Sequence, residues 1–189
     1  MRILFLGNSF TFFHDLPKIV SQMLLCEVKS HTRGGARLAE QLNPETEMGT
    51  KTLKALKEEK WDYVVMQEQS FAPVGNFEAF LRSVKALSTL IKENGATPVL
   101  YATWAYRENS EMLSDTGLSY TGMADALRNN YAKAALETGS LMADVGTLFT
   151  RTRDIITPYE KDDYHPSEAG TVLAACEIAR VIRENEQNK

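Results

Sequence analysis

Three polar residues near opposite ends of the chain are of types that together could perform nucleophilic catalysis. Ser9 follows an apolar run at the amino terminus, whereas Asp162 and His165 lie close to the carboxyl terminus. A serine hydroxyl is a weak nucleophile unless a base takes its proton. A histidine can be that base, and a carboxylate can orient the histidine and stabilise its charged form. The residue types predict Ser9 as nucleophile, His165 as general base and Asp162 as its carboxylate.

The spacing at the carboxyl terminus favours Asp162 over its neighbour Asp163. Pro166 follows His165 directly, and a residue before proline is pushed out of the helical region, so His165 should project from a loop. A turn of three residues can bring the Asp162 carboxylate to one imidazole nitrogen and leave the other for Ser9. Asp163 is the alternative, with poorer reach. Taken singly, Ser9 could be an ordinary turn serine and His165 a capping or surface residue.

The elements that would position these residues alternate between strands and helices. Short apolar runs predict strands, and apolar residues at helical spacing predict helices. The expected strands cover residues 3–6, 26–32, 61–66, 97–103 and 141–145. Helices are expected at 16–24, around 53–56, at 77–94, at 120–138 and after residue 166. This alternation predicts an α/β fold, a doubly wound three-layer α/β/α sandwich around a five-stranded parallel sheet, formed by residues 1–189 as a single domain.

The carboxyl edge of such a sheet is where ligands bind, and further candidate residues follow the predicted strands there. The backbone N–H groups of Ser9 and Gly35 are candidate oxyanion donors, and a side-chain amide after the third strand would supply another. Gln67 and Gln69 have the same parity along an extended strand, so both could face the cleft. Gln69 and Trp104 are candidate substrate-pocket residues, although each could equally be a loop or packing residue.

The composition excludes several classes of partner. The chain has 189 residues, of which 43% are hydrophobic and 24% charged, and a net charge of −4. This charge gives no general attraction to nucleic acid or to anionic membranes. No targeting leader is recognisable, so a cytoplasmic protein is expected, with prior removal of a signal peptide as the alternative. The two cysteines are expected to be reduced core thiols. No cofactor or metal site is expected, and no oligomeric state is indicated.

The segments at both ends resemble motifs of the SGNH hydrolases, also called GDSL-type esterases and lipases. These segments are Ile-Leu-Phe-Leu-Gly-Asn-Ser-Phe-Thr at 3–11 and Asp-Asp-Tyr-His-Pro at 162–166, in the order and places usual for the family. The resemblance spans nearly the whole chain and implies a flavodoxin-like sandwich. It also implies a serine esterase, often acting on O-acetyl groups of sugars, with Ser9, His165 and Asp162 as the triad and Gly35 as an oxyanion donor.

Two positions depart from the usual family motifs. Asn8 stands where most members have aspartate before the serine, and this variation is tolerated. The third motif is usually Gly-x-Asn-Asp, whereas residues 67–70 read Gln-Glu-Gln-Ser. The chain therefore resembles a subset of the family in which a glutamine replaces the asparagine in the oxyanion hole. Gln67 is favoured for this role over Gln69.

Two other functions are compatible with parts of the pattern. An acyltransferase would use the same triad but pass the acyl group to a sugar hydroxyl. A flavodoxin-like module would bind FMN or another phosphate at the first turn. That turn has a single glycine and no phosphate-cradling run, and the module would leave Asp162 and His165 unexplained. The absence of a long lid favours small acyl groups. The sequence identifies neither the acyl chain nor the alcohol.

Overall fold

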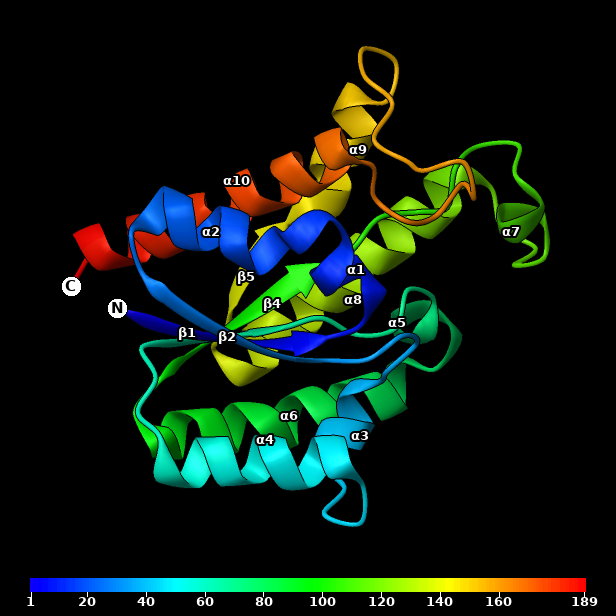
Figure 1. Ribbon diagram of the computed structural model, residues 1–189. Helices are drawn as coiled ribbons and strands as arrows, with labels where there is room; N and C mark the ends of the chain where they lie inside the picture. The colour runs from blue at the N-terminus through cyan, green and yellow to red at the C-terminus, as the bar shows by residue number, and fades with distance from the viewer.

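A five-stranded parallel sheet forms the centre of the protein (Figure 1). The structure is a computed structural model that describes residues 1–189. Its strands are β1 (Arg2–Gly7), β2 (Glu27–Thr32), β3 (Tyr63–Met66), β4 (Thr97–Ala102) and β5 (Leu141–Asp144). Their order is β2-β1-β3-β4-β5, and every neighbouring pair is parallel. The predicted α/β fold with a five-stranded parallel sheet is confirmed.

Two layers of helices cover the two faces of the sheet (Figure 1). The layer drawn above the sheet contains α2 (Leu16–Leu24), α9 (Val145–Thr152) and α10 (Glu168–Gln187). The other layer contains α4 (Glu47–Glu58), α6 (Phe77–Asn94) and α8 (Tyr120–Thr138). Short helical segments follow strands at their carboxyl ends: α1 (Ser9–Phe12) with η1 (Phe13–Asp15), α3 (Leu38–Gln41), α5 (Ala72–Gly75) and α7 (Glu111–Ser114).

Strand β1 shows why the sheet needs both layers. Its side chains alternate between the faces, so that Leu4 and Leu6 pack with α4, α6 and α8. Ile3 and Phe5 pack on the other side with α2, α9 and α10. All four are fully buried. A continuous apolar run is typical of a parallel strand that is buried on both faces, which is how the sequence specifies a central strand here.

Several helices begin at side chains that satisfy their free N–H groups. Asn76 accepts a hydrogen bond from the Ala79 N–H at the start of α6, and Ser119 accepts one from the Gly122 N–H at the start of α8. Ser167 caps α10 by accepting from the Gly170 N–H. The cap at Ser167 matters most for function, because it places the start of α10 just after His165.

Some sequence-based expectations about the last part of the chain are wrong. The charged residues and prolines between the last strand and His165 predict one long loop there, but Val145–Thr152 is helix α9. Its two turns are too short for a clear hydrophobic period. The residue types of Val172 and Cys176 predict that both widen the apolar stripe of the last helix, but in α10 Val172 is 44% exposed and Cys176 is also exposed. The cysteines are therefore not both core thiols: Cys26 is half-buried and Cys176 lies at the surface.

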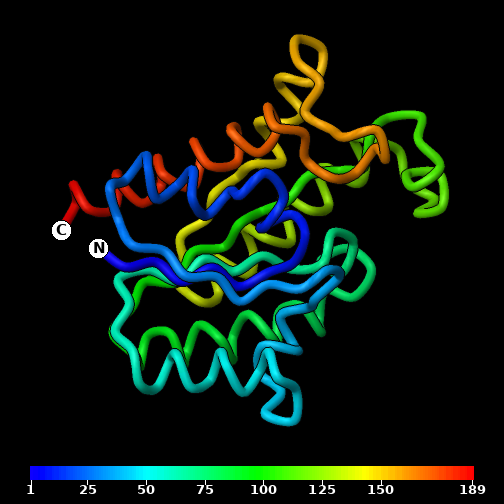
Figure 2. The backbone as a smooth tube through the Cα atoms, in the orientation of Figure 1, coloured from blue at the N-terminus to red at the C-terminus, as the bar shows by residue number.

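The backbone trace shows how distant segments meet at the carboxyl edge of the sheet (Figure 2). The loop between α9 and α10 lies beside the segment that follows β4. The backbone N–H of Arg107 donates to the carbonyl oxygen of Asp163 at 2.8 Å across this contact. Both chain termini lie at the opposite end of the sheet (Figure 2). None of the helices combines the length and the hydrophobicity that crossing a membrane requires.

Candidate active site

Ser9 begins helix α1 directly after β1. The Asn8 side chain caps this helix by accepting a hydrogen bond from the Phe10 N–H at 3.1 Å. The amide of the same side chain donates to the carbonyl oxygen of Ala36 at 3.1 Å, which ties the turn to the loop after β2. The Ser9 N–H makes no hydrogen bond within the protein, as expected for the first turn of a helix. The hydroxyl and a free amide of Ser9 therefore occur together at the sheet edge.

His165 lies between Ser9 and Asp162 and contacts both. Its Nε2 is 2.8 Å from Ser9 Oγ, and its Nδ1 is 2.7 Å from Asp162 Oδ2. An ionised carboxylate can only accept hydrogen bonds, so the ring proton is assigned to Nδ1. Nε2 is then free to accept the hydrogen bond of the Ser9 hydroxyl. The fold thus brings together three residues separated by as many as 156 positions.

Asp162, rather than Asp163, contacts the histidine. Its Oδ1 also accepts hydrogen bonds from the backbone N–H groups of His165 at 3.0 Å and Tyr164 at 3.3 Å. Burial acts to raise the pKa of Asp162, but the hydrogen bonds from His165 and from these amides outweigh it and lower the pKa below its ordinary value. Asp163 turns away to pair with Arg107 at 3.1 Å. Its backbone has a φ of 68°.

Gly35 lies in the exposed loop after β2, beside the turn that carries Ser9. The pairing of β1 and β2 continues into this loop, since the Arg33 N–H donates to the Gly7 carbonyl oxygen at 3.4 Å. Gly35 has a φ of 67°, a conformation that favours glycine. Like Ser9, it has a backbone N–H without a hydrogen-bond partner in the protein. Its role as an oxyanion donor stays a prediction, and the free amide is compatible with it.

Gln67 is fully buried at the end of β3, where it supports the Ser9 turn. Its side-chain oxygen accepts hydrogen bonds from the Asn8 N–H and from the Thr11 hydroxyl, both at 2.9 Å. Its amide nitrogen donates to the carbonyl oxygen of Glu68. Both the oxygen and the nitrogen of the Gln67 side-chain amide are therefore hydrogen-bonded to other groups of the protein. Its predicted role as an oxyanion donor stays a prediction.

The two candidate pocket residues have different surroundings. Gln69 is half-buried, and its side-chain oxygen accepts from the N–H groups of Phe71 and Ala72 at the start of α5. Trp104 is 0% exposed and stacks between Phe10 and Phe149, with ring centroids 4.6 Å and 3.9 Å away. The interpretation of Trp104 as a pocket wall is therefore wrong, because packing on both ring faces leaves no surface for substrate.

Comparison with solved structures identifies the family. A structure assigned to the SGNH hydrolases, from Slackia heliotrinireducens, is 44% identical to this chain. The similarity covers 96% of this chain and 98% of that one, with a TM-score of 0.92. The chain belongs to the SGNH hydrolases. This confirms the family predicted from the motifs at the two ends, and it makes the protein a hydrolase.

More distant structures share the SGNH hydrolase fold. A DUF4886 family protein from Bacteroides uniformis is 20% identical, with a TM-score of 0.78 over 97% of this chain and 83% of that one. Axe2, an acetylxylan esterase from Geobacillus stearothermophilus, is 16% identical, with a TM-score of 0.71 over 96% and 93%. No family model and no curated protein matches the chain. The more distant structures show the fold alone.

Glu68 is a residue of this SGNH hydrolase whose position the sequence did not reveal. It is only 3% exposed. Its Oε1 accepts hydrogen bonds from the Gln69 N–H at 2.7 Å and from the Leu38 N–H at 3.3 Å. Burial raises the pKa of Glu68, against the lowering effect of these two hydrogen bonds. Glu68 thereby connects the loop that carries Gly35 to the loop that follows β3. A lone acidic residue in a polar run gave no sign of this.

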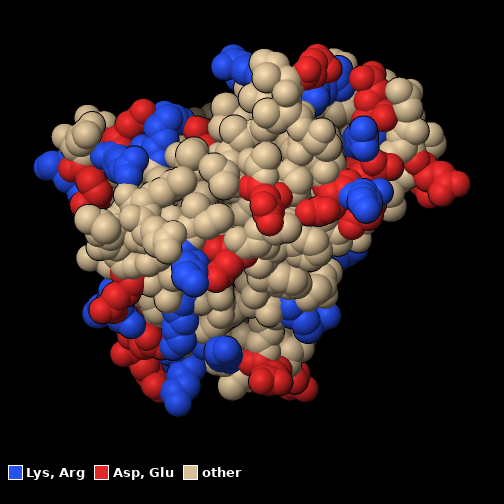
Figure 3. Space-filling view, turned by 45° about the horizontal axis from the view of Figure 1, so that its top comes forward, with Lys and Arg blue, Asp and Glu red and all other residues tan.

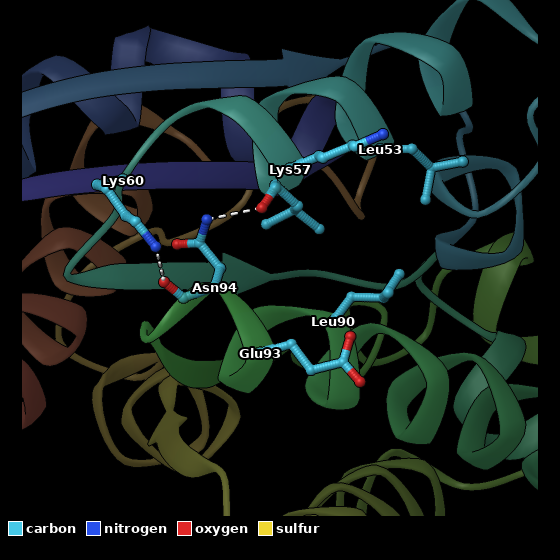
Figure 4. A pocket seen from close by; sticks show the side chains of 7 residues that line it. Leu53, Lys57, Lys60, Leu90, Glu93 and Asn94 are labelled. Atoms are coloured by element: carbon cyan, nitrogen blue, oxygen red, sulfur yellow. Dashed lines mark hydrogen bonds between the residues drawn. The ribbon is translucent and has the colours of Figure 1, made fainter.

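One cavity of the protein lies away from Ser9. It has a volume of about 410 Å³ and lies between α4 and α6, with Leu53 and Leu90 among its lining residues (Figure 4). At one end, Lys60 donates to the Asn94 carbonyl oxygen at 3.0 Å. Lys60 precedes β3 and Asn94 precedes β4, so this end of the cavity is at the amino edge of the sheet. It offers no nucleophile or base for the chemistry of the opposite edge.

The outer surface shows no single charged field on the face seen in Figure 3. There, basic and acidic side chains are interspersed with uncharged areas. Ion pairs at the protein surface include Arg107 with Asp163 and Arg153 with Glu108. The distribution agrees with the small net charge of −4.

Proposed function

We propose that this SGNH hydrolase is a serine esterase that cleaves short-chain esters of the O-acetyl type, with an acetylated carbohydrate as the leading substrate class. One observation carries the proposal. Ser9 Oγ, the His165 ring and the Asp162 carboxylate form a continuous hydrogen-bonded chain, with distances of 2.8 Å and 2.7 Å. This arrangement can remove the serine proton as the nucleophile attacks.

In the acylation step, Ser9 Oγ attacks the ester carbonyl carbon while its proton moves to His165 Nε2. The resulting imidazolium is stabilised by Asp162, which stays ionised and keeps the Nδ1 proton oriented. The tetrahedral intermediate then collapses: the bond to the alcohol oxygen breaks, and that oxygen takes the proton from Nε2. The alcohol leaves, and the acyl group remains on Ser9.

The oxyanion of each tetrahedral intermediate requires donors that are already in place. The free N–H groups of Ser9 and Gly35 are the proposed backbone donors, with Gln67 as the predicted side-chain donor. Each such donor contributes about 2.7–4 kcal/mol to transition-state stabilisation. In deacylation, His165 takes a proton from water, the hydroxyl attacks the acyl carbon, and Ser9 Oγ recovers its proton as it leaves.

One observation supports a small acyl group. Trp104 is packed in the core rather than lining an apolar acyl tunnel. Axe2, which shares the fold, is an acetylxylan esterase, which makes acetylated sugars the first substrates to test. Transfer of the acyl group to a sugar hydroxyl would use the same triad, but no specific observation favours it.

The test is hydrolysis of p-nitrophenyl esters of graded chain length and of acetylated sugars by the wild type and by Ser9→Ala. The acetate should be cleaved fastest, and Ser9→Ala should lower kcat by about 10⁶-fold. Ser114→Ala, at an exposed serine of α7, is the control and should leave kcat unchanged. Retained activity in Ser9→Ala would refute the proposal. Products formed with a competing alcohol would reveal a transferase.

A further inference from the structure

The phenyl ring of Phe13 lies flat against the imidazole of His165, with the ring centroids 4.2 Å apart and the planes 1° from parallel. We propose that Phe13 is a positioning residue that holds the His165 ring during ester hydrolysis, most of all while the acyl-enzyme is hydrolysed. The inference rests on the proposed serine esterase function and assigns a role to a residue outside the triad.

The stack restrains a motion that the hydrogen bonds of His165 leave open. The bonds of Nδ1 to Asp162 and of Nε2 to Ser9 lie close to the plane of the ring. They fix the edges of the ring but resist rotation out of the plane only weakly. A ring packed on the face opposes that rotation. Phe10 contacts His165 edge-on at 5.7 Å, and the Tyr164 ring lies 4.0 Å away but is tilted by 38°, so Phe13 provides the parallel contact.

The backbone around Phe13 is built in a conformation that needs support. His14 and Asp15 have φ values of 47° and 57°, which cost about 1–2 kcal/mol for each residue other than glycine. Such strain at a functional site is maintained by surrounding contacts. One contact is the bond between His14 Nε2 and Glu160 Oε1 at 2.9 Å. The Glu160 N–H in turn donates to the His165 carbonyl oxygen at 2.9 Å.

These contacts form a clamp of Phe13 and His14 on the loop that carries His165. Phe13 stacks on the ring, and His14 is bonded to Glu160, which is bonded to the backbone of His165. Phe13 is only half-buried and is not among the buried apolar residues between the sheet and its two layers of helices. Its substitution should therefore affect the clamp more than the packing of the domain.

The clamp should matter unequally in the two halves of the reaction. During acylation, His165 is held by Asp162, by Ser9 and by Phe13. In the acyl-enzyme, the oxygen of Ser9 carries the acyl group and no longer donates a hydrogen bond to Nε2. The hydrogen bond to Asp162 and the packing of the surrounding aromatic rings then hold the imidazole while it activates water, and among these rings Phe13 alone is stacked in parallel on it. Loss of the stack should slow deacylation more than acylation.

The experiment compares Phe13→Leu with Phe13→Tyr, using p-nitrophenyl acetate, whose good leaving group makes kcat report deacylation. Phe13→Leu should lower kcat by about tenfold through misplacement of the base, with a parallel fall in KM and little change in kcat/KM. Acetylated Ser9 should accumulate in the intact-mass spectrum. Phe13→Tyr, which keeps the stack, should restore kcat. Phe12→Leu, at a 41% exposed neighbour without contact to His165, is the matched control.

An unchanged kcat in Phe13→Leu, or equal losses of kcat and kcat/KM, would overturn the inference. Should Phe13→Leu not fold, His14→Asn is measured instead, because asparagine tolerates a positive φ but is too short to reach Glu160. It should show the same loss of kcat with little change in kcat/KM. An unchanged kcat, or equal losses of kcat and kcat/KM, in this variant would also overturn the inference. Failure of the esterase proposal is separate: the wild type would then not be acetylated at Ser9.

A second readout does not require turnover. The proton on His165 Nδ1, held by Asp162, should give a downfield NMR resonance in the wild type. In Phe13→Leu this proton should exchange with water at least several times faster, whereas in Phe12→Leu it should exchange at the wild-type rate. An equal exchange rate in wild type and Phe13→Leu would overturn the inference even if no substrate were found.

Discussion

The side-chain oxygen of Gln67 accepts a hydrogen bond from the backbone N–H of Asn8 at 2.9 Å, from the end of β3 to the end of β1. The Thr11 hydroxyl donates to the same oxygen at 2.9 Å. This close contact explains why residue 7 is a glycine, because a Cβ there would lie 2.6 Å from the Gln67 oxygen and 2.4 Å from Thr11 Oγ1. The turn that presents Ser9 is therefore built directly on a buried glutamine.

Replacement of Gln67 by methionine should destabilise the protein and slow catalysis. The Asn8 N–H and the Thr11 hydroxyl would be left without a buried acceptor, at a cost of about 1–3 kcal/mol for each group. Gln69→Met is the matched control: it removes an acceptor at the start of α5, which costs about 1 kcal/mol. Urea unfolding should place Gln67→Met well below Gln69→Met in stability.

The same variants separate support of the turn from oxyanion stabilisation. If Gln67 served only as an oxyanion donor, Gln67→Met would keep its unfolding free energy and lose about 10²–10³-fold in kcat. If that loss of kcat appeared in Gln69→Met instead, the donor would be Gln69. Each result assigns the oxyanion amide to a different residue.

Asp162→Asn should reduce kcat much more than Asp163→Asn. An asparagine at 162 can present an amide N–H to His165 Nδ1 and favour the wrong tautomer, with an expected loss of about 10²–10⁴-fold. Asp163 pairs with Arg107 at a partly exposed site, where an ion pair contributes about 0–1 kcal/mol. Asparagine also tolerates its φ of 68°. Similar losses in both variants would contradict the assignment of Asp162.

The lowered pKa of Asp162 also predicts how the difference in unfolding free energy between wild type and Asp162→Asn changes with pH. A carboxyl with a lower pKa in the folded state stabilises the protein fully above its unfolded-state pKa of about 3.9. That contribution is lost as the pH falls through the folded-state value. Urea unfolding should therefore show Asp162→Asn less stable than wild type at pH 7. The difference should shrink below pH 4, and a constant difference would contradict the prediction.

Gly35→Ala should affect both stability and activity, whereas Gly34→Ala should affect neither. No atom lies within 4 Å of a Cβ placed at either position, but only Gly35 has a positive φ, of 67°. Alanine there should cost about 1–2 kcal/mol. Relaxation of this strain would move the Gly35 N–H from its predicted oxyanion position and lower kcat. Thermal melts and p-nitrophenyl acetate kinetics check this, and equal behaviour of the two variants would contradict it.

The sequence predicts the sheet and the three residues that meet, because these depend on strong local signals. The apolar run at 3–6 and the bounds of the helix at 120–138 agree with the structure. The spacing of Asp162 and His165 before a proline is also local, and their contact is present. Trp104 shows the limit of this reasoning: an aromatic residue after a strand has the same pattern whether it packs inside or lines a pocket.

Other parts of the site depend on contacts that sequence spacing does not encode. No carboxylate lies at a telling spacing from His14 in the sequence, yet His14 pairs with Glu160, 146 positions away. The backbone of His14 is left-handed, with a φ of 47°, and its partner comes from a distant segment of the chain. Glu68 likewise gains its role from two backbone N–H groups, one of them 30 positions away. Both residues act through tertiary geometry rather than through a motif.

The buried carboxyl of Glu68 leads to a prediction about pH and stability. Burial raises its pKa, and the charge of Glu40 adds to this, while the N–H groups of Gln69 and Leu38 and the charge of Arg37 oppose it. A carboxyl with a raised pKa takes up its proton in the folded protein at a higher pH than in the unfolded chain. The contribution of Glu68 to the free energy of unfolding therefore rises as the pH falls through the folded-state pKa. It reaches its full value below about pH 4.3, the pKa of the carboxyl in the unfolded chain.

Glu68→Gln removes this ionisation but keeps an oxygen that can accept from the Leu38 and Gln69 N–H groups. The free energy of unfolding of the variant, relative to that of wild type, should therefore be highest at pH 7. This difference should decrease as the pH falls towards 4. Urea unfolding of both proteins at pH 7, 5.5 and 4 measures the change. Glu45→Gln, at an exposed loop position, controls for the loss of one charge. A difference between Glu68→Gln and wild type that stays constant over this range would show that Glu68 does not titrate with a raised pKa. Its carboxylate would then be held by the two amides strongly enough to offset its burial.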